Sequence, residues 1–318
     1  MKLTKLFSLL SIFFLTACRP GGFSSDASEE SDQKIDVPHD AGIPLIKIKS
    51  SKTIEDEPKV NATMQIVSHD SLLFDGNIGI EIRGAVSQMF YRKKSYGFEI
   101  RDETGKGLKK SLLGLPENED WVLHGPYGDK TLLRNVVAYQ LSNSIGRYAA
   151  RTRFVELEIN DKYLGYYVLI EKMKRGKERI NVHKLEENDN DSAKISGGYI
   201  LKLDKTVGGG NNGQDDYTAI NSFKSEYDVN GKKTDKTITH FLYEDPKPKK
   251  ITALQSNYIK NYMLNFERAL AAPTFKEEAI GYRKYIDVPS FIDYFLLTEL
   301  MQNHDGYRSE ERRVGKEC

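Results

Sequence analysis

Residues 290–301 place the strongest constraint on the fold of this chain. They read S-F-I-D-Y-F-L-L-T-E-L-M, which puts apolar side chains on almost every side of a helix. Asp287 and Pro289 stand where the start of such a helix is expected. A helix that is apolar all round is typical of a protein interior, so we expect this one to lie buried in the core.

A polar cluster of Asn303, His304, Asp305 and Gly306 follows this helix directly. A carboxylate on a loop that a core helix holds in place is well positioned to act as a catalytic base. The alternative is that Asn303 and Asp305 end the helix and open a turn. These residues alone leave both interpretations open.

The composition indicates a globular protein and excludes some partners. The chain has 318 residues, of which 39% are hydrophobic and 10% aromatic, enough for one large or two modest domains. Its 47 basic and 46 acidic residues give a formal net charge of +1. This balance gives no indication of binding to nucleic acid, and we predict no nucleic-acid partner.

The N-terminal residues predict export. Residues 1–18 combine a basic start with an apolar run that is too short to span a bilayer, as in a signal peptide. They end in L-T-A-C, which resembles the bacterial lipobox and implies cleavage before Cys18, lipid on its thiol and anchoring to a membrane outside the cytoplasm. The alternative is an ordinary signal peptide with a chance cysteine. Residues 19–43, rich in Ser, Asp and Glu, are predicted to be a flexible tether.

Two alternating stretches, residues 78–83 and 96–101, predict neighbouring half-buried strands joined by a turn or loop. Extending the second pattern backwards places Lys94 on the apolar face and Lys93 on the other face. An inward ammonium requires an anionic partner, either a carboxylate or a ligand phosphate. Alternatively, the Lys94 stem covers the core while its charged end reaches water.

The middle of the chain predicts a loop, a helix and a hairpin. Residues 112–123 are expected to form a loop that anchors Trp121 on the sheet. Asp129 is a predicted N-cap for a helix that ends near Gly146 and carries Arg134, either an anion-binding residue or a surface arginine. A hairpin over residues 155–170 ends in Glu171 and Lys172, where either a cleft opens or the strand reaches the surface.

Fewer features are predicted in the next hundred residues. Residues 197–204 are a predicted strand, and the Gly-, Asn- and Lys-rich residues 206–236 receive no structural assignment. An amphipathic helix is marked by apolar residues at Ile259, Met263, Phe266 and Leu270.

Seven blocks, spread over residues 78–308 and in the same order, resemble the spore coat protein H (CotH) kinase family. They are I-E-I-R-G at 80–84, K-K-S-Y-G-F-E at 93–99, L-L-G-L-P-E-N-E-D-W-V-L at 112–123, D-K-T-L-L-R-N at 129–135, the hairpin sequence at 154–172, G-G-Y-I-L-K-L-D at 197–204, and the helix and polar cluster at 285–308.

The resemblance implies an atypical, secretory-type protein kinase with an α+β fold of two lobes, the first rich in strands and the second helical. It implies transfer of the γ-phosphate of ATP, with Mg²⁺ or Mn²⁺, to Ser or Thr of extracytoplasmic proteins. Phosphoryl transfer mainly requires that the protein position the reactants and neutralise charge. A non-catalytic surface lipoprotein with a binding or structural role in envelope or coat assembly is the alternative.

The resemblance also assigns residues to the site. By matching position, Asp305 resembles the catalytic aspartate of the family, with Asn303 beside it. Strand phase, helix position and family position together give the candidates for ATP binding: Arg83, Lys93, Lys94, Arg134, Glu171 and Lys172.

The last residues depart from the family pattern. The family continues into strands and a W-D-F-D/N segment, whose aspartate is expected to hold the metal, and residues 309–318 do not resemble it. We therefore expect a kinase-like domain over residues 44–308, a non-native tail over 309–318, and an inactive fragment in which no residue is assigned to the metal.

Overall fold

The computed structural model describes residues 42–84, 86–203, 217–228, 231–235, 239–303 and 306. The predicted signal peptide, Cys18 and nearly all of the predicted tether lie outside these residues. So do His304, Asp305 and the predicted tail. None of the helices in the described ranges has both the length and the apolar content needed to cross a membrane.

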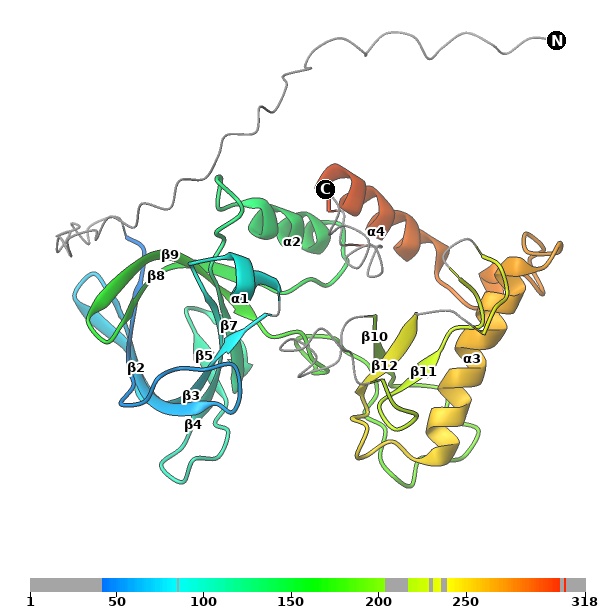
Figure 1. Cartoon of the computed structure of the whole chain (residues 1–318), viewed down its shortest axis with the longest axis horizontal. Helices are drawn as coiled ribbons and strands as arrows, with labels where there is room; N and C mark the ends of the chain where they lie inside the picture. The colour runs from blue at the N-terminus through cyan, green and yellow to red at the C-terminus, as the bar shows by residue number, and fades with distance from the viewer. Residues whose placement is uncertain are drawn as a thin grey trace, which may run out of the picture. The chain divides into compact units, whose positions relative to one another are not determined.

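A closed β-barrel forms the first half of the described chain (Figure 1). Its strands follow the order β1-β2-β3-β4-β7-β9-β8, and all neighbours are antiparallel except β1 and β8, which close the barrel in parallel. The strands are β1 (Leu45–Lys49), β2 (Val60–Ser68), β3 (Ser71–Arg83), β4 (Ser95–Arg101), β7 (Asp120–His124), β8 (Thr152–Ile159) and β9 (Lys162–Glu171).

The barrel interior is a continuous apolar core. Every strand contributes side chains to it, because successive residues of a strand point to opposite faces. Trp121, Phe98 and Tyr167 are the largest fully buried side chains. Burying each large apolar side chain contributes roughly 1.5–3 kcal/mol, so this core accounts for much of the stability of the barrel.

The strands predicted from alternation are confirmed. β3 and β4 pair in antiparallel register from Asn77 opposite Arg101 to Arg83 opposite Ser95. The loop between them holds a short helix, α1 (Val86–Phe90). The predicted hairpin is also confirmed as β8 and β9. Its turn residues Asn160 and Asp161 have positive φ angles of 50° and 64°, as a tight two-residue hairpin turn requires.

Residues 112–123 are not the predicted loop. They contain the end of β5 (Lys110–Leu112), all of β6 (Leu115–Asn118) and most of β7, which carries Trp121. The turn between β5 and β6 uses Leu113 and Gly114, with φ angles of 50° and 73°. These strands are too short for alternation to show in the sequence, which explains the error.

The helix predicted from Asp129 begins later than expected, as α2 (Arg134–Ser144). Asp129 is not the N-cap residue of α2, because a turn over residues 130–133, in which Leu132 has a positive φ of 61°, separates it from the helix. Its carboxylate instead accepts hydrogen bonds from the backbone N–H groups of Thr131 and Arg134. Val136 of α2 packs on outward-facing apolar side chains of the barrel strands β7 and β9, namely Val122, Val168 and Ile170.

A second, smaller sheet has the order β10-β12-β11, with β10 (Ile200–Lys202), β12 (His240–Asp245) and β11 (Ser222–Lys224). The predicted strand over 197–204 is therefore shorter than expected, and β11 lies in the stretch that received no assignment. The predicted amphipathic helix is confirmed as α3 (Ala253–Ala271), which packs on this sheet through Ile259 and begins with a capping box of Thr252 and Gln255. A 3₁₀ turn, η1 (Tyr282–Lys284), follows it.

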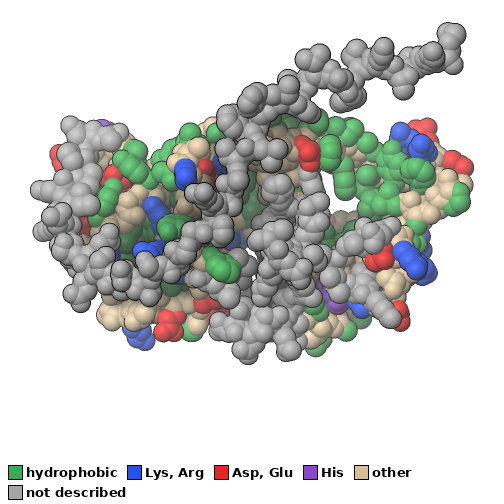
Figure 2. All heavy atoms as spheres, turned by 45° about the horizontal axis from the view of Figure 1, so that its top comes forward, with side chains coloured by type: hydrophobic (Ala, Val, Ile, Leu, Met, Phe, Trp, Pro, Cys, Tyr) green, Lys and Arg blue, Asp and Glu red, His purple; other side chains and the backbone are tan. Residues whose placement is uncertain are grey.

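The apolar helix is present as α4 (Val288–Leu300), with Asp287 as its N-cap, but the prediction that it is buried was wrong. Its only buried residue is Thr298, and six large apolar side chains are more than half exposed: Phe291, Ile292, Tyr294, Phe295, Leu296 and Leu300. Figure 2, which turns the top of Figure 1 toward the viewer, shows hydrophobic side chains gathered at the upper right of the view. Burial depends on neighbours as well as on sequence, and in the described part of the chain α4 packs on α2, with Arg147 pairing to Asp287 and Asp293.

Candidate functional site

A row of outward-facing side chains crosses three barrel strands where β3 ends, β4 begins and β7 ends. Arg83 lies opposite Ser95, and the pairing of Tyr96 with Leu123 places Ser95 beside His124. His124 points out of the barrel, because Trp121 and Leu123 of the same strand point into the core.

Lys93 lies at this end of the barrel with only neutral partners among the described residues. Its Nζ donates to the backbone oxygen of Tyr166 at 2.5 Å and lies 4.5 Å from the ring centre of Tyr167. Burial lowers the pKa of Lys93 from its ordinary value, because a charged ammonium loses hydration there. Because no described carboxylate pairs with Lys93, an anion that enters from solvent can do so and would favour its charged form.

Lys94 reaches the neighbouring backbone in a similar way. Its Nζ donates to the carbonyl oxygen of Gln88 in α1 at 2.6 Å, while its own carbonyl accepts the hydroxyl of Tyr167 at 2.9 Å. The sequence predicted an anionic partner, either a carboxylate or a ligand phosphate, and among the described residues the partner of Lys94 is this neutral oxygen. Gly125 lies against the same residues, and a Cβ there would come within 2.8 Å of the Lys94 oxygen and 3.0 Å of the Lys93 Cγ.

His124 completes the group together with α2. Its Nε2 lies 3.3 Å from Nδ2 of Asn135, in the first turn of the helix. Burial lowers the pKa of His124, and the charges of Arg83 and Lys93 lower it further, whereas Asp129 has the opposite effect. We call Arg83, Lys93, Lys94, His124 and Asn135 the rim cluster.

Three members of the rim cluster were predicted from the sequence, and two were not. Arg83, Lys93 and Lys94 were candidates, and the structure brings them to one end of the barrel. His124 was missed because β7 was taken for a loop, and Asn135 was missed because its role depends on the position of His124. Recognition of β7 as a strand would have shown His124 facing outward, one residue beyond Leu123.

Arg134 starts α2, next to Asn135, but its side chain is 64% exposed. Its Nε lies 3.9 Å from Asp129, a distance at which an exposed pair contributes little. The structure therefore places Arg134 at the edge of the rim cluster.

Glu171 and Lys172 lie elsewhere along the strands. Glu171 pairs with Trp121, which is three residues before His124 in β7, about 10 Å at the usual rise of a strand. Its buried carboxylate accepts two hydrogen bonds of 2.9 Å from the Arg151 side chain and lies 3.9 Å from Nε of Arg179. The structure therefore does not bring Glu171 and Lys172 together with the rim cluster.

The polar residues after α4 are described only in part. The N–H of Asn303 donates to the Thr298 oxygen at 3.0 Å, and the Asn303 oxygen accepts from Gly306 at 2.9 Å. Asn303 therefore lies in a turn that follows the last residue of α4, Leu300. Asp305 lies outside the described residues.

The rim cluster suits an anion better than a metal ion. It presents cations whose described partners include neutral backbone oxygens, which is the chemistry that binds phosphate. In the described ranges, no three Asp, Glu, His or Cys side chains are grouped as metal ligands. Asp129, the nearest carboxylate, already accepts hydrogen bonds from Thr131 and Arg134. The described residues thus do not fit a metal centre of their own.

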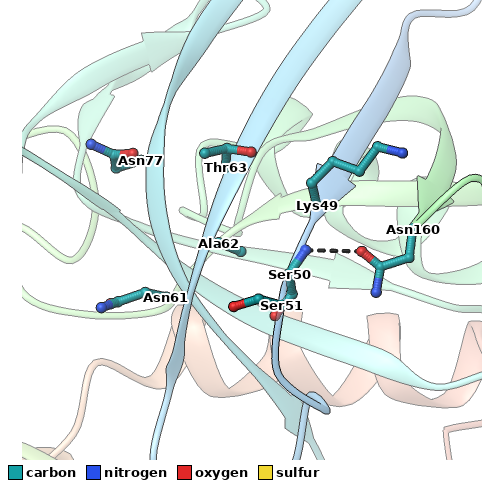
Figure 3. Close-up of a pocket in the computed structure, with 8 residues that line it drawn as sticks. All are labelled: Lys49, Ser50, Ser51, Asn61, Ala62, Thr63, Asn77 and Asn160. Atoms are coloured by element: carbon teal, nitrogen blue, oxygen red, sulfur yellow. Dashed lines mark hydrogen bonds between the residues drawn. The ribbon is translucent and has the colours of Figure 1, made fainter.

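A pocket of about 450 Å³ lies beside the middle of β3, between the end of β1, β2 and the β8–β9 turn (Figure 3). Its lining is mostly neutral and polar, with Ser50 N donating to Asn160 Oδ1 at 2.9 Å. Its one lining cation, Lys49, forms an ion pair with Asp161. This pocket lacks the available positive charge that distinguishes the rim cluster.

Comparison with known families agrees with the resemblance noted in the sequence. The family described as CotH kinase protein matches residues 80–314. The matched range includes the whole rim cluster and compares with the predicted span of 78–308. No curated protein sequence matches the chain.

Proposed function

Because the chain belongs to the CotH kinase protein family, we propose that it is a protein kinase that transfers the γ-phosphate of ATP to Ser or Thr of extracytoplasmic proteins. The observation that carries this proposal is the rim cluster, where Lys93 and Lys94 donate to backbone oxygens. A nucleotide phosphate is the anion that a kinase has to hold, and it offers these ammonium groups charged oxygen acceptors.

In this proposal, Lys93 and Lys94 bind phosphate oxygens and Arg83 adds positive charge from the neighbouring strand. Neutralising the charge of the phosphates, and fixing their position, are the main contributions of a protein to phosphoryl transfer. By family resemblance, Asp305 accepts or orients the hydroxyl of the protein substrate. Glu171 supports the fold of the barrel rather than binding the nucleotide, because its carboxylate is paired with Arg151 and Arg179.

The proposal also covers the two lobes, the divalent ion and the membrane anchor. The barrel and the later helical part correspond to the two lobes of a kinase-like fold. A divalent ion, Mg²⁺ or Mn²⁺, would reduce the charge of the ATP phosphates during transfer, and no described residue is assigned to it. Lipid on Cys18 would hold the protein at a membrane outside the cytoplasm, where its substrates are found.

The test combines nucleotide binding with phosphate transfer. We expect this chain to bind ADP. We expect a form of the protein that continues into the W-D-F-D/N segment of the family to transfer label from γ-labelled ATP to Ser or Thr of an acceptor protein such as casein. Asp305→Ala is expected to lower the transfer rate by about 100- to 10,000-fold while ADP affinity is retained. Asp56→Ala is the matched control, because Asp56 is an exposed carboxylate outside the rim cluster.

The outcomes separate the kinase from its alternative. Transfer that survives in Asp305→Ala would contradict the catalytic role of Asp305. ADP binding without transfer in the form that carries the W-D-F-D/N segment would favour the non-catalytic lipoprotein. Absence of ADP binding would contradict the proposed site.

A further inference from the structure

We propose that His124 is a phosphate-binding residue of the rim cluster, which takes up a proton when the phosphate binds, and that Asn135 holds its ring in place. The inference rests on the proposed function, because it concerns the same end of the barrel. It adds a residue to the phosphate site and makes binding of the nucleotide depend on pH.

The hydrogen bond with Asn135 defines the starting state of the ring. An amide nitrogen can only donate, so Nε2 of His124 accepts from Nδ2 of Asn135 at 3.3 Å, and the proton of the neutral ring is on Nδ1. When the ring takes a proton from water, that proton goes to Nε2. Nε2 then becomes a donor, and a phosphate oxygen is a better partner for it than the Asn135 nitrogen.

Burial and two neighbouring cations favour the neutral ring of His124 until an anion arrives. The facing groups are Arg83 from β3, Lys93 from the segment before β4, and Asp129 from the loop before α2. On β9, the residue opposite His124 is the apolar Val168. Burial and the two cations lower the pKa of His124 more than Asp129 raises it.

A bound phosphate reverses this balance. It brings negative charge next to Arg83 and Lys93, and an opposite charge within a few ångströms favours the protonated imidazole. The pKa of His124 therefore rises on binding. It follows that the protein takes up a proton with the nucleotide, and that nucleotide affinity increases as the pH falls toward about 6.

Nuclear magnetic resonance of the histidine rings tests this directly. The ring signals of wild-type protein are followed from about pH 5 to 8, alone and with ADP, pyrophosphate or adenosine, and the His124 signal is identified by its loss in His124→Gln. We expect ADP and pyrophosphate to raise the His124 pKa by at least about one pH unit. Adenosine, which has no phosphate, is expected to leave it unchanged. His183, which is exposed and lies outside the rim cluster, is the internal control.

Binding measurements provide a second readout. His124→Gln keeps a hydrogen-bonding side chain but cannot take up a proton. We expect it to weaken ADP binding about tenfold at pH 6 and much less at pH 8, so that the pH dependence of affinity is lost. His183→Gln is the matched control and is expected to bind ADP like the wild type.

Each outcome decides the inference. If ADP binds and the His124 pKa does not rise, the inference is overturned while the proposed function stands. If pyrophosphate raises the pKa but ADP does not bind, the inference is supported and the proposed kinase function fails. If no phosphate compound changes the His124 signal, the inference is overturned.

Discussion

The lysines near the two ends of β7 have different hydrogen-bond partners. At the start of the strand, Lys174 donates to Glu119 at 2.8 Å and to Asp120 at 2.6 Å. At its end, Lys93 and Lys94 donate to backbone oxygens. Burial disfavours the charge of Lys174, but the hydrogen bonds to the two carboxylates outweigh it and raise its pKa. Burial lowers the pKa of Lys93, and no carboxylate of the described residues compensates for the lost hydration.

This difference separates charges that support the fold from charges that can bind a ligand. Removing one member of a buried ion pair leaves the other charge uncompensated. Substitutions of the ion-paired residues at the start of β7 should therefore lower the free energy of unfolding. A cation with neutral partners leaves no buried opposite charge behind when it is removed. Substitutions of the lysines at the end of β7 should therefore weaken anion binding.

The largest expected effect on stability is at Glu171. Glu171→Gln leaves Arg151 and Arg179 beside a neutral amide, and we expect the free energy of unfolding to fall by about 3–5 kcal/mol. Urea unfolding followed by tryptophan fluorescence measures this, because Trp121 is the only tryptophan and lies opposite Glu171. Glu187→Gln, which changes an exposed carboxylate, is the control. A loss below about 1 kcal/mol would mean that the ion pairs do not support the barrel.

Lys174 should show a smaller effect that depends on pH. Burial works against ionisation of Glu119 and Asp120, but the hydrogen bonds from Lys174 hold the pKa of each below its ordinary value. Their contribution to stability is therefore present above the unfolded pKa near 4 and is lost as the pH falls through the folded values.

We expect Lys174→Met to lower the free energy of unfolding by about 1–3 kcal/mol at neutral pH. The difference from wild type should shrink as the pH falls below about 4, because both carboxyls then become protonated. Urea unfolding at pH 7, 5 and 3 checks this. A difference that stays constant over this range would show that Lys174 acts through packing rather than charge.

The smallest expected effect is at Arg134. Its exposed side chain pairs weakly with Asp129, so Arg134→Ala should change the free energy of unfolding by less than about 0.5 kcal/mol. Asp129→Ala is the informative comparison. It removes hydrogen bonds to the turn before α2 and should cost about 1 kcal/mol. Equal losses in thermal melting would show that the Arg134 side chain, not the turn, supports this helix.

Strand phase predicted much of the barrel from sequence but not the roles of its lysines. β3 and β4 were predictable because their apolar residues alternate over a long stretch. Lys94 was assigned inward by extending that alternation, yet β4 begins at Ser95, so the phase no longer determines the environment of the two lysines. Which lysine loses its hydration depends on Tyr166 of β9, 73 residues later in the chain, and no local pattern contains that information.

The same limit applies to Glu171 and α4. The sequence showed a charge at the end of an apolar strand, but not that Arg151 and Arg179 would occupy it. The composition of α4 predicted a helix correctly, whereas its burial depends on which elements cover it. Local patterns thus predict the elements, and contacts between distant segments decide the site.

ADP affinity in two sets of lysine variants tests the central claim most directly. Isothermal titration calorimetry would compare wild type with the double variant Lys93→Met/Lys94→Met and with Lys174→Met. We predict that the double variant loses ADP affinity by about 100-fold or more, because two charged donors to phosphate are removed, and that Lys174→Met binds like the wild type. Retained affinity in the double variant, with a loss in Lys174→Met, would contradict the assignment of the rim cluster as the phosphate site.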